Sequence, residues 1–418
     1  MNFIDLFSGA GGLSEGFIKT GYKPIAHVEI DKHACTTLET RLIYHKLKSS
    51  NKLNVYNDYL LGKMSRNDFI SKYGCDEISN SIINMAIGGK SNSIIFDKID
   101  GILKDKTVDI IIGGPPCQAY SLIGRSRDVN RMKNDSRNYL YKDYAKFLIK
   151  YKPKVFVFEN VLGLLSAQKG LYFKNMKESF RSIGYNLDYK VQHSENFGVL
   201  QKRRRIILIG WRKDIDFSYP DFKITDIKFK VQDLLSDLKP LKPGELNNVT
   251  KYVKKTNKYL DLFKLRNGNN FVTQHIARPH NKRDLEIYEI AINKWKNNTS
   301  LKYPDLPARL KTHKNEKSFL DRFKVVNSNG LSHTMVAHIS KDGHYYIYPD
   351  TQQVRSLSVR EAARIQSFPD DYFFEGGRTS AFKQIGNAVP PLMSKEIAEA
   401  IKTNLNGKRK RKQLTETG

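Results

Sequence analysis

The sequence predicts an α/β fold, a doubly wound and mostly parallel sheet, followed by a second, smaller domain. In the first half of the chain, short apolar runs typical of buried strands alternate with amphipathic segments of helical spacing. Such alternation is typical of parallel sheets with helices on both faces. From about residue 226 the alternation stops, and the stretch DLKPLKPGELNN indicates a linker or loop.

The individual elements of the first half follow from these runs. We expect strands over residues 3–7, 25–28, 108–112, 155–158 and 206–209. We expect helices over residues 13–20, 139–150 and 173–183. Residues 45–95 are polar and rich in Lys, Asn and Ser, which predicts an insertion between sheet elements.

The second half is less regular. Segment 226–350 is basic, with aromatic residues interspersed. After it, VRSLSVREAARIQSFP predicts a helix that begins after a capping Ser358 and ends before Pro369. The last residues, GKRKRKQLTETG, predict a disordered basic tail.

Chemically useful residues follow four of the predicted strands. The first strand leads into a glycine loop, Ser8–Gly12, and the second ends at Glu29. The third leads through GGPP to Cys117, and the fourth ends at Glu159. Because ligands of such sheets bind beyond the carboxyl ends of the strands, this edge is the predicted active site.

The glycine loop and Glu29 suggest a nucleoside cofactor. Glycines let a ligand approach the backbone, and free N–H groups at a helix start favour an anionic group. The spacing is not GxGxxG, so a pyrophosphate is a poor candidate. An acid at the end of the next strand can accept hydrogen bonds from ribose hydroxyls. A tight strand–helix turn beside a solvated acid is the alternative.

Cys117 and the arginines of QKRRR suggest chemistry at the same edge. Rigid prolines and nearby basic residues fit a reactive thiol, although a lone cysteine is commonly a buried structural residue. Glu159 is able to transfer a proton if burial raises its pKa. In a continuous strand, Arg203 and Arg205 point to one side and Arg204 to the other, so two guanidiniums would face a phosphate or a base carbonyl.

The composition points to a nucleic-acid partner. Lys and Arg number 71 against 43 Asp and Glu, which gives a net charge of +28. A Lys- and Asn-rich proteome is the alternative source of this charge. Three widely spaced cysteines argue against a disulfide framework or a zinc site, so we expect no metal. No apolar stretch reaches about 18–20 residues and the start lacks a secretory signal, so we expect a cytoplasmic protein without membrane contact.

Several motifs together resemble one family. FIDLFSGAGG, VEIDKHA, GGPPCQAYS, FVFENV, QKRRRI, VREAARIQSFPDDY and IGNAVP occur in the order typical of DNA (cytosine-5)-methyltransferases, of the bacterial kind that accompanies restriction enzymes. The resemblance covers most of residues 1–225 and 350–400. It departs at Leu200, where the family often has proline, and at Ser367, where it often has glycine. Neither departure removes a functional group.

The resemblance implies a role for each matching residue. Cys117 matches the nucleophile that attacks cytosine C6, and Glu159 the acid that contacts N3. Arg203 and Arg205 match the arginines that hold the cytosine and the neighbouring backbone. The residues matching the S-adenosylmethionine pocket are Phe7, Gly9, Gly11, Gly12, Glu29, Asp97, Pro116, Leu140 and Asn387. The insertion blurs the alignment around Asp97.

The resemblance also implies a division of the chain, with the fold of S-adenosylmethionine-dependent methyltransferases in residues 1–225. Residues 226–380 would recognise the target, 381–405 would return to the catalytic domain, and 406–418 would form the basic tail. The expected partners are double-stranded DNA, whose target base must flip out, and a cognate restriction endonuclease. We expect a monomer.

Three other functions compete with this interpretation. An RNA (tRNA) cytosine-5 methyltransferase would share almost every motif. A non-catalytic DNA-binding relative would be expected to lack Cys117 or Glu159. A nicotinamide-dependent oxidoreductase is disfavoured by the missing GxGxxG.

Overall fold

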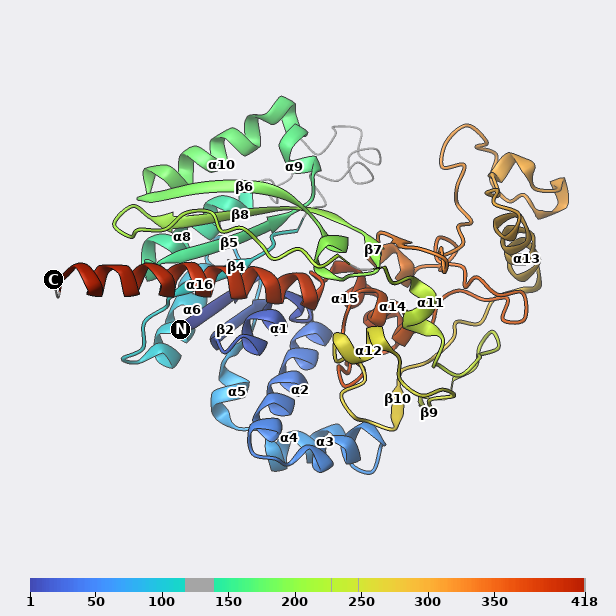
Figure 1. Cartoon of the computed structure of the whole chain (residues 1–418), viewed down its shortest axis with the longest axis horizontal. Helices are drawn as coiled ribbons and strands as arrows, with labels where there is room; N and C mark the ends of the chain where they lie inside the picture. Colours follow the sequence, from blue (N-terminus) through green and yellow to red (C-terminus); the bar gives the residue numbers. More distant parts are fainter. Residues whose placement is uncertain (117–138, 227, 247, 417–418) are drawn as a thin grey trace.

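The computed structural model describes residues 1–116, 139–226, 228–246 and 248–416, and a seven-stranded sheet lies at its centre (Figure 1). The strand order is β3-β2-β1-β4-β5-β8-β6. The strands are β1 Asn2–Leu6, β2 Lys23–Glu29, β3 Ile82–Asn84, β4 Ile110–Gly113, β5 Val155–Asn160, β6 Tyr185–His193 and β8 Arg204–Arg212. Neighbours from β3 to β5 are parallel, and β8 is antiparallel to both β5 and β6. The predicted doubly wound, mostly parallel sheet is confirmed.

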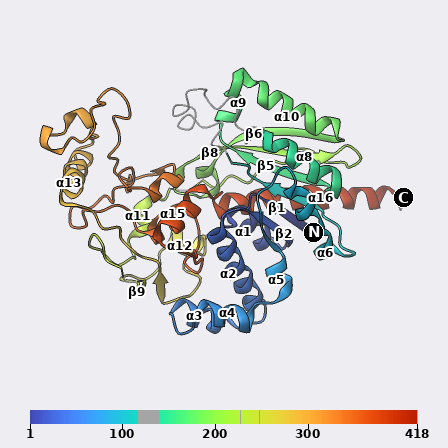
Figure 2. The same cartoon turned by 180° about the vertical axis from the view of Figure 1, so that it is seen from behind.

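The two faces of the sheet are covered by different helices. The main ones are α1 Gly12–Lys19, α2 Lys32–Ser49, α6 Ser91–Leu103, α8 Leu140–Tyr151, α10 Leu171–Ser182 and α16 Pro391–Glu416. Since successive strand residues point to opposite faces, Phe3 packs with α1 and α16, whereas Ile4 packs with α6, α8 and α10. Figure 1 shows α16 crossing one face, and Figure 2 shows α6 and α8 on the other.

Helix α16 brings the end of the chain back to its beginning. A Cβ on Gly16 of α1 would lie 2.4 Å from the Lys395 nitrogen, so only glycine permits this approach of the two helices. The Ser394 hydroxyl donates to the Leu13 carbonyl, and the Tyr22 hydroxyl donates to the Ala398 carbonyl at 3.1 Å. The helix continues to Glu416, through the segment for which the sequence predicted a separate tail from residue 406.

The predicted insertion is a helical subdomain that also contains an edge strand. Its helices are α3 Leu53–Leu60, α4 Arg66–Tyr73 and α5 Asp76–Asn80, and β3 follows them. The hydroxyl of Tyr56 donates to the Asp371 carbonyl at 2.8 Å, and that of Tyr59 to the Glu375 carboxylate at 2.7 Å. The insertion therefore braces the loop that follows α14.

The second half of the chain has little regular sheet. It contains the paired strands β9 Val249–Lys251 and β10 Phe271–Thr273, and β11 Ser332–His333, which pairs with β7 Gln201–Lys202. Its helices are α11 Val231–Leu235, α12 Lys258–Leu262, α13 Lys282–Lys296, α14 Val359–Ile365 and α15 Arg378–Asn387. The remaining short helices among the described residues are α9 Gly163–Ser166, η2 Ala167–Gly170, η3 Ser194–Phe197, η4 Tyr303–Asp305, η5 Ala308–Leu310 and η6 Ala337–Ser340. In the described part of the chain, no helix is long and apolar enough to cross a bilayer.

Helix α14 is fully buried, and its Arg364 forms ion pairs with an acid that precedes the helix in the chain and with one that follows it. Ser358 caps it as predicted, since its hydroxyl accepts from Glu361 N while the Glu361 carboxylate accepts from Ser358 N. Arg364 pairs with Asp237 at 2.5 Å and with Asp370 at 2.6 Å, and all three side chains are at most 1% exposed. Burial alone would raise the pKa of Asp370, but the Arg364 guanidinium lowers it below its usual range.

We expect Arg364→Met to destabilise the protein strongly, although methionine is of similar length. The change leaves Asp237 and Asp370 buried without their cation, which costs about 3–5 kcal/mol in comparable cases. Denaturant titration would measure the loss of unfolding free energy. The control is Lys63→Met, which breaks an exposed pair with Asp58 and should change it little. Equal losses of unfolding free energy from the two substitutions would show that the buried ion pairs of Arg364 stabilise the protein no more than the exposed pair does.

Candidate active site at the carboxyl edge of the sheet

The loop after β1 turns sharply into α1. Phe7, Gly9 and Gly11 have φ values of 58°, 54° and 81°, in the left-handed region that favours glycine. The Ala10 carbonyl accepts a hydrogen bond from the Tyr372 hydroxyl. A residue from the second half of the chain, Tyr372, thus anchors the glycine loop.

The glycines of this loop have different surroundings. A Cβ on Gly12 would lie 2.3 Å from the Val389 carbonyl oxygen, and one on Gly11 would lie 2.7 Å from Leu38 Cδ2. A Cβ on Gly9 would meet no atom within 4 Å. Gly11 and Gly12 therefore serve close packing, whereas Gly9 borders open space.

Glu29 connects the glycine loop to the turn after β2. One carboxylate oxygen accepts from Gly9 N and the other from Asp31 N, both at 2.8 Å. Burial raises the pKa of Glu29, although these N–H donors act in the opposite direction. Asp31 in turn caps α2 and pairs with Lys383 of α15 at 2.7 Å.

Two residues beside Glu29 were not predicted from the sequence. Ile30 is 69% exposed, and Asn84 donates from its side chain to the carbonyls of Glu29 and Ile30 at 3.0 and 2.9 Å. Asn84 ends β3 and is the register partner of Glu29. The position of Ile30 inside VEIDKHA was the available signal, whereas Asn84 was hidden within the predicted insertion.

Asp97 lies elsewhere on the molecule. It is an exposed residue of α6, six residues or about 9 Å beyond the start of that helix. With Asp76 and Lys106 it lines a surface hollow of about 840 Å³ between α5, β3 and α6. Among the described residues, no hydrogen bond or ion pair joins Asp97 to Glu29 or the glycine loop. Asn84, and not Asp97, stands at the end of β3.

Glu159 and Arg205 form a pair on neighbouring antiparallel strands. The Arg205 Nε lies 2.8 Å from a Glu159 carboxylate oxygen, and each side chain is 12% exposed. A Cβ on Gly114 would lie 2.8 Å from the other Glu159 oxygen, so the glycine lets the chain pass the acid. The next residue, Asn160, donates to the Pro115 carbonyl at 3.2 Å and fixes the direction of the chain there.

The predicted nucleophile follows this turn. Cys117 lies outside the described residues, and the exposed Pro116 is the last described residue before it. Leu140 is a partly buried residue at the start of α8, and Asn387 is exposed at the end of α15. Of the other cysteines, Cys35 is buried, which raises its pKa to about 12.

Arg203 and Arg205 have different partners, although the sequence predicted that they face the same side of one strand. Arg203 is fully buried, and its guanidinium donates to the Met335 carbonyl at 2.6 Å and to the Ala388 carbonyl at 2.9 Å. The expected continuous strand is interrupted, because β7 ends at Lys202 and β8 begins at Arg204. Arg203 therefore joins three distant segments, while Arg205 holds Glu159.

The strand ends that the sequence predicted to share an edge are adjacent. Leu6 of β1 pairs with Val28 of β2 and with Gly113 of β4, which pairs with Phe158 of β5. The glycine loop, Glu29, the GGPP turn and Glu159 thus lie at the carboxyl ends of four neighbouring parallel strands. Asp5, beneath the glycine loop, is buried with one carboxylate oxygen unpartnered, and burial together with nearby Glu29 raises its pKa well above its usual range.

Known proteins resemble the chain over nearly its whole length. A family model described as C-5 cytosine-specific DNA methylase matches residues 1–102 and 89–403. The type II methyltransferase M.Bpa9945I of Bacillus paralicheniformis is 44% identical, with 97% of this chain and 100% of the relative aligned. M.DdeI of Desulfomicrobium norvegicum is 31% identical, with 96% and 88% aligned.

A solved structure has the same fold. It is described as a putative DNA modification methyltransferase encoded within a prophage of E. coli, with a TM-score of 0.64 and 23% identity over 97% of this chain and 99% of that one. The family model spans both the glycine loop and the segment that contains Asn387. This chain belongs to the C-5 cytosine-specific DNA methylases and is a DNA (cytosine-5)-methyltransferase.

Proposed function

We propose that the protein transfers a methyl group from S-adenosylmethionine to C5 of a cytosine within a specific double-stranded DNA sequence. The reaction proceeds through a bond between Cys117 and cytosine C6, on a base flipped out of the duplex. One observation carries the proposal: the Glu159–Arg205 pair lies against Gly114, three residues before Cys117. The segment that leads to Cys117 therefore passes directly beside the acid.

The pocket residues fit the proposed cofactor. Gly9 borders open space, which leaves room for a ligand against the backbone of the loop. The Glu29 carboxylate retains lone pairs that can accept hydrogen bonds from ribose hydroxyls, and the exposed Ile30 beside it offers an apolar contact to a base ring. When bound, S-adenosylmethionine supplies an electrophilic methyl group. Phe7, Pro116, Leu140 and Asn387 remain proposed contacts.

The chemistry assigns separate tasks to three side chains. The Cys117 thiolate adds to C6 while N3 takes a proton from Glu159, so that C5 becomes an enamine carbon. Arg205 orients the Glu159 carboxyl. With the cofactor bound, C5 would then be able to take its methyl group, and the electron pair of the broken methyl–sulfur bond would remain on sulfur. A base removes the C5 proton, the C5–C6 double bond re-forms, the thiolate leaves, and the N3 proton returns to Glu159.

The rest of the chain serves DNA recognition in this proposal. Residues 226–380 carry basic and aromatic side chains but neither Cys117 nor Glu159, so we assign sequence reading to them. Arg203 acts as a positioning residue, because it ties this region and the C-terminal segment to the strand that bears Arg205. Modification of host DNA would protect it from a cognate restriction endonuclease.

Expression in a host that lacks cytosine methylation tests the function. We expect bisulfite sequencing to reveal 5-methylcytosine at one recurring sequence, and none with Cys117→Ser. Methylated tRNA with unmethylated DNA would contradict the proposal. So would methylation scattered without a common sequence.

The nucleophile can be trapped. DNA with 5-fluorocytosine at the target cannot lose its C5 substituent as a cation, so in the presence of S-adenosylmethionine we expect a protein–DNA adduct that survives denaturing electrophoresis. Cys117→Ser should form almost none, because a hydroxyl supplies very little anion. Cys35→Ser and Cys75→Ser should trap normally, and Glu159→Gln slowly. An adduct that depends on Cys35 or Cys75 would overturn the assignment.

A single methyl group at Gly114 tests the position of Glu159. We expect Gly114→Ala to lower kcat by about 10- to 100-fold, because its Cβ would displace the carboxylate that lies 2.8 Å away. DNA affinity and melting temperature should stay near those of the wild type. The matched control is Gly101→Ala in α6, where a Cβ meets no atom within 4 Å. A fully active Gly114→Ala enzyme would argue against this role of Glu159.

A further inference from the structure

The most exposed aromatic side chain in the described part of the chain is Phe319, at 61%. It belongs to a small lobe, here called the α13 lobe, which comprises residues 281–325. The core of the lobe contains Ile287 and Tyr288 of α13 together with Tyr303 and Leu310. The nearby Phe323 packs on this core, whereas Phe319 does not belong to it.

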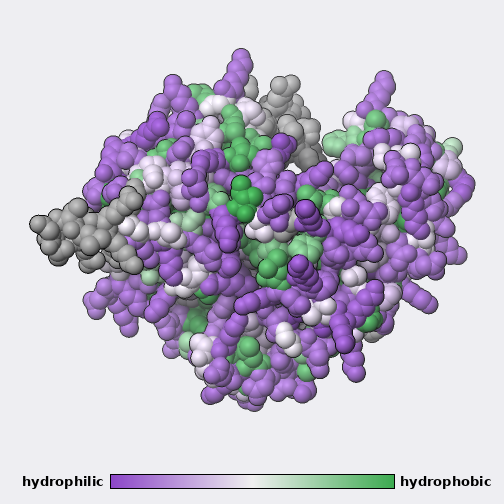
Figure 3. All heavy atoms as spheres, viewed as in Figure 1, coloured by the Kyte–Doolittle hydropathy of each residue, from purple (hydrophilic) through white to green (hydrophobic). Residues whose placement is uncertain are grey.

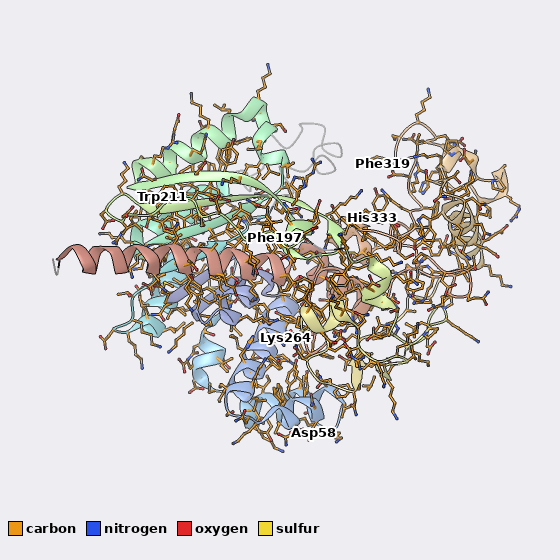
Figure 4. The ribbon with its side chains drawn as sticks, viewed as in Figure 1. Asp58, Phe197, Trp211, Lys264, Phe319 and His333 are labelled. Atoms are coloured by element: carbon orange, nitrogen blue, oxygen red, sulfur yellow. The ribbon has the colours of Figure 1, made fainter. Side chains whose placement is uncertain are left out.

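Phe319 faces the catalytic half of the molecule. Figure 4 shows its label on the side of the α13 lobe that faces α9, the helix that follows β5 and Glu159. Figure 3 shows that this face of the molecule is mostly hydrophilic. DNA whose target base reaches Glu159 would pass between these parts.

The backbone on both sides of Phe319 is anchored to the lobe. The Arg322 guanidinium stacks 4.0 Å above the Tyr303 ring and donates to the carbonyls of Asn315 and Ser318 at 2.7 and 3.2 Å. After Phe319, the Leu320 carbonyl accepts from Tyr303 N at 2.8 Å. The phenyl ring is therefore presented on a fixed loop.

Presenting the ring in this way costs folding free energy. Phe319 has a φ of 55°, which is unfavourable for any residue with a Cβ, and a phenyl ring in water forgoes the gain of burial. A glycine or an asparagine would fit this backbone better, and a polar side chain would suit the exposure. The residue is thus poorly explained by the stability of the lobe.

The charges around Phe319 suit a polyanion. Lys314 and Lys317 are exposed, and neither makes an ion pair with an acid in the described part of the chain. The other lysines near the loop, Lys311 and Lys324, do have acidic neighbours. Two lysines without acidic partners beside an exposed aromatic ring suit duplex DNA: the ammonium groups can contact phosphates, and the ring can contact the stacked bases.

We infer that Phe319 is a wedge that inserts between two base pairs of the bound DNA and unstacks them, while Lys314 and Lys317 contact the adjacent phosphates. A rigid apolar side chain can occupy the space between bases only when the duplex opens there, which kinks the DNA. Steps that open easily are then preferred, so Phe319 contributes to sequence choice without a hydrogen bond to any base. This inference rests on the proposed action on duplex DNA.

The test uses the full-length enzyme and a short duplex that carries the sequence identified by bisulfite sequencing. In separate duplexes, 2-aminopurine replaces one base at a time, since its fluorescence rises when its neighbours unstack. With the wild type we expect a rise at the target position and a second rise at one other step. Phe319→Gly should abolish the second rise, keep the first, and weaken binding by about tenfold or more.

Variants separate a wedge from a structural residue. Because glycine tolerates the positive φ, Phe319→Gly should leave the melting temperature unchanged or raise it while DNA affinity falls. Phe319→Leu, which keeps an apolar side chain, should restore part of the second rise. The control is Ile149→Ala, which removes an exposed apolar side chain on α8 and should match the wild type in every measurement.

Two results would overturn the inference. One is a fluorescence profile and affinity of Phe319→Gly equal to those of the wild type. The other is a drop in melting temperature large enough to account for the lost affinity. If the wild type itself fails to methylate the duplex, the proposed function fails first, and that outcome is independent of Phe319.

Discussion

The backbone of Gly12 lies so close to the Val389 carbonyl that no side chain fits between them. This approach joins the first helix of the sheet domain to the segment that precedes α16. It also restrains the glycine loop, because Gly11 and Gly12 have no room to move toward Leu38 and Val389. A loop held in this way can keep Gly9 turned toward open space, beside Glu29. The geometry of the proposed cofactor pocket thus depends on a contact between residues far apart in the sequence.

The same junction also receives the second half of the chain. The Ala388 carbonyl accepts from Arg203 and from the Gln366 side chain, at 2.9 and 3.0 Å. The Arg203 guanidinium also donates a hydrogen bond to the Met335 carbonyl. Gln366 is the first residue after α14, a helix whose Arg364 is buried and paired with Asp370. Burying such charges is favourable only when every partner is in place, so this region has one arrangement of low energy. The region that we propose reads DNA and the residues that we propose act on the base are therefore held in one frame.

The sequence predicted the sheet well because the underlying signal is local. Strands β1, β2, β4, β5 and β8 are buried apolar runs, and the helices between them have apolar residues at helical spacing. Strand β3 has only three residues, and β6 alternates exposed polar residues at the edge of the sheet, so neither gave such a signal. Because β3 was missed, Asn84, its last residue and the register partner of Glu29, was missed with it. The prediction that Arg203 and Arg205 face the same side failed for another reason. Side-chain alternation in the sequence does not reveal that a strand is interrupted at a single residue, here Arg203.

The packing of α16 on α1 has a consequence for how the protein is made. Ribosomes release a chain from its beginning at about 5–20 residues per second, and domains usually fold as they emerge. The sheet strands are complete once Arg212 has left the ribosome, but the groove beside α1 stays empty until residues 391–401 appear. During that interval Gly12 and Gly16 have nothing to pack against, and apolar side chains such as Phe17 lack their final cover. The packing around α1 is therefore completed only after residues 391–401 have emerged.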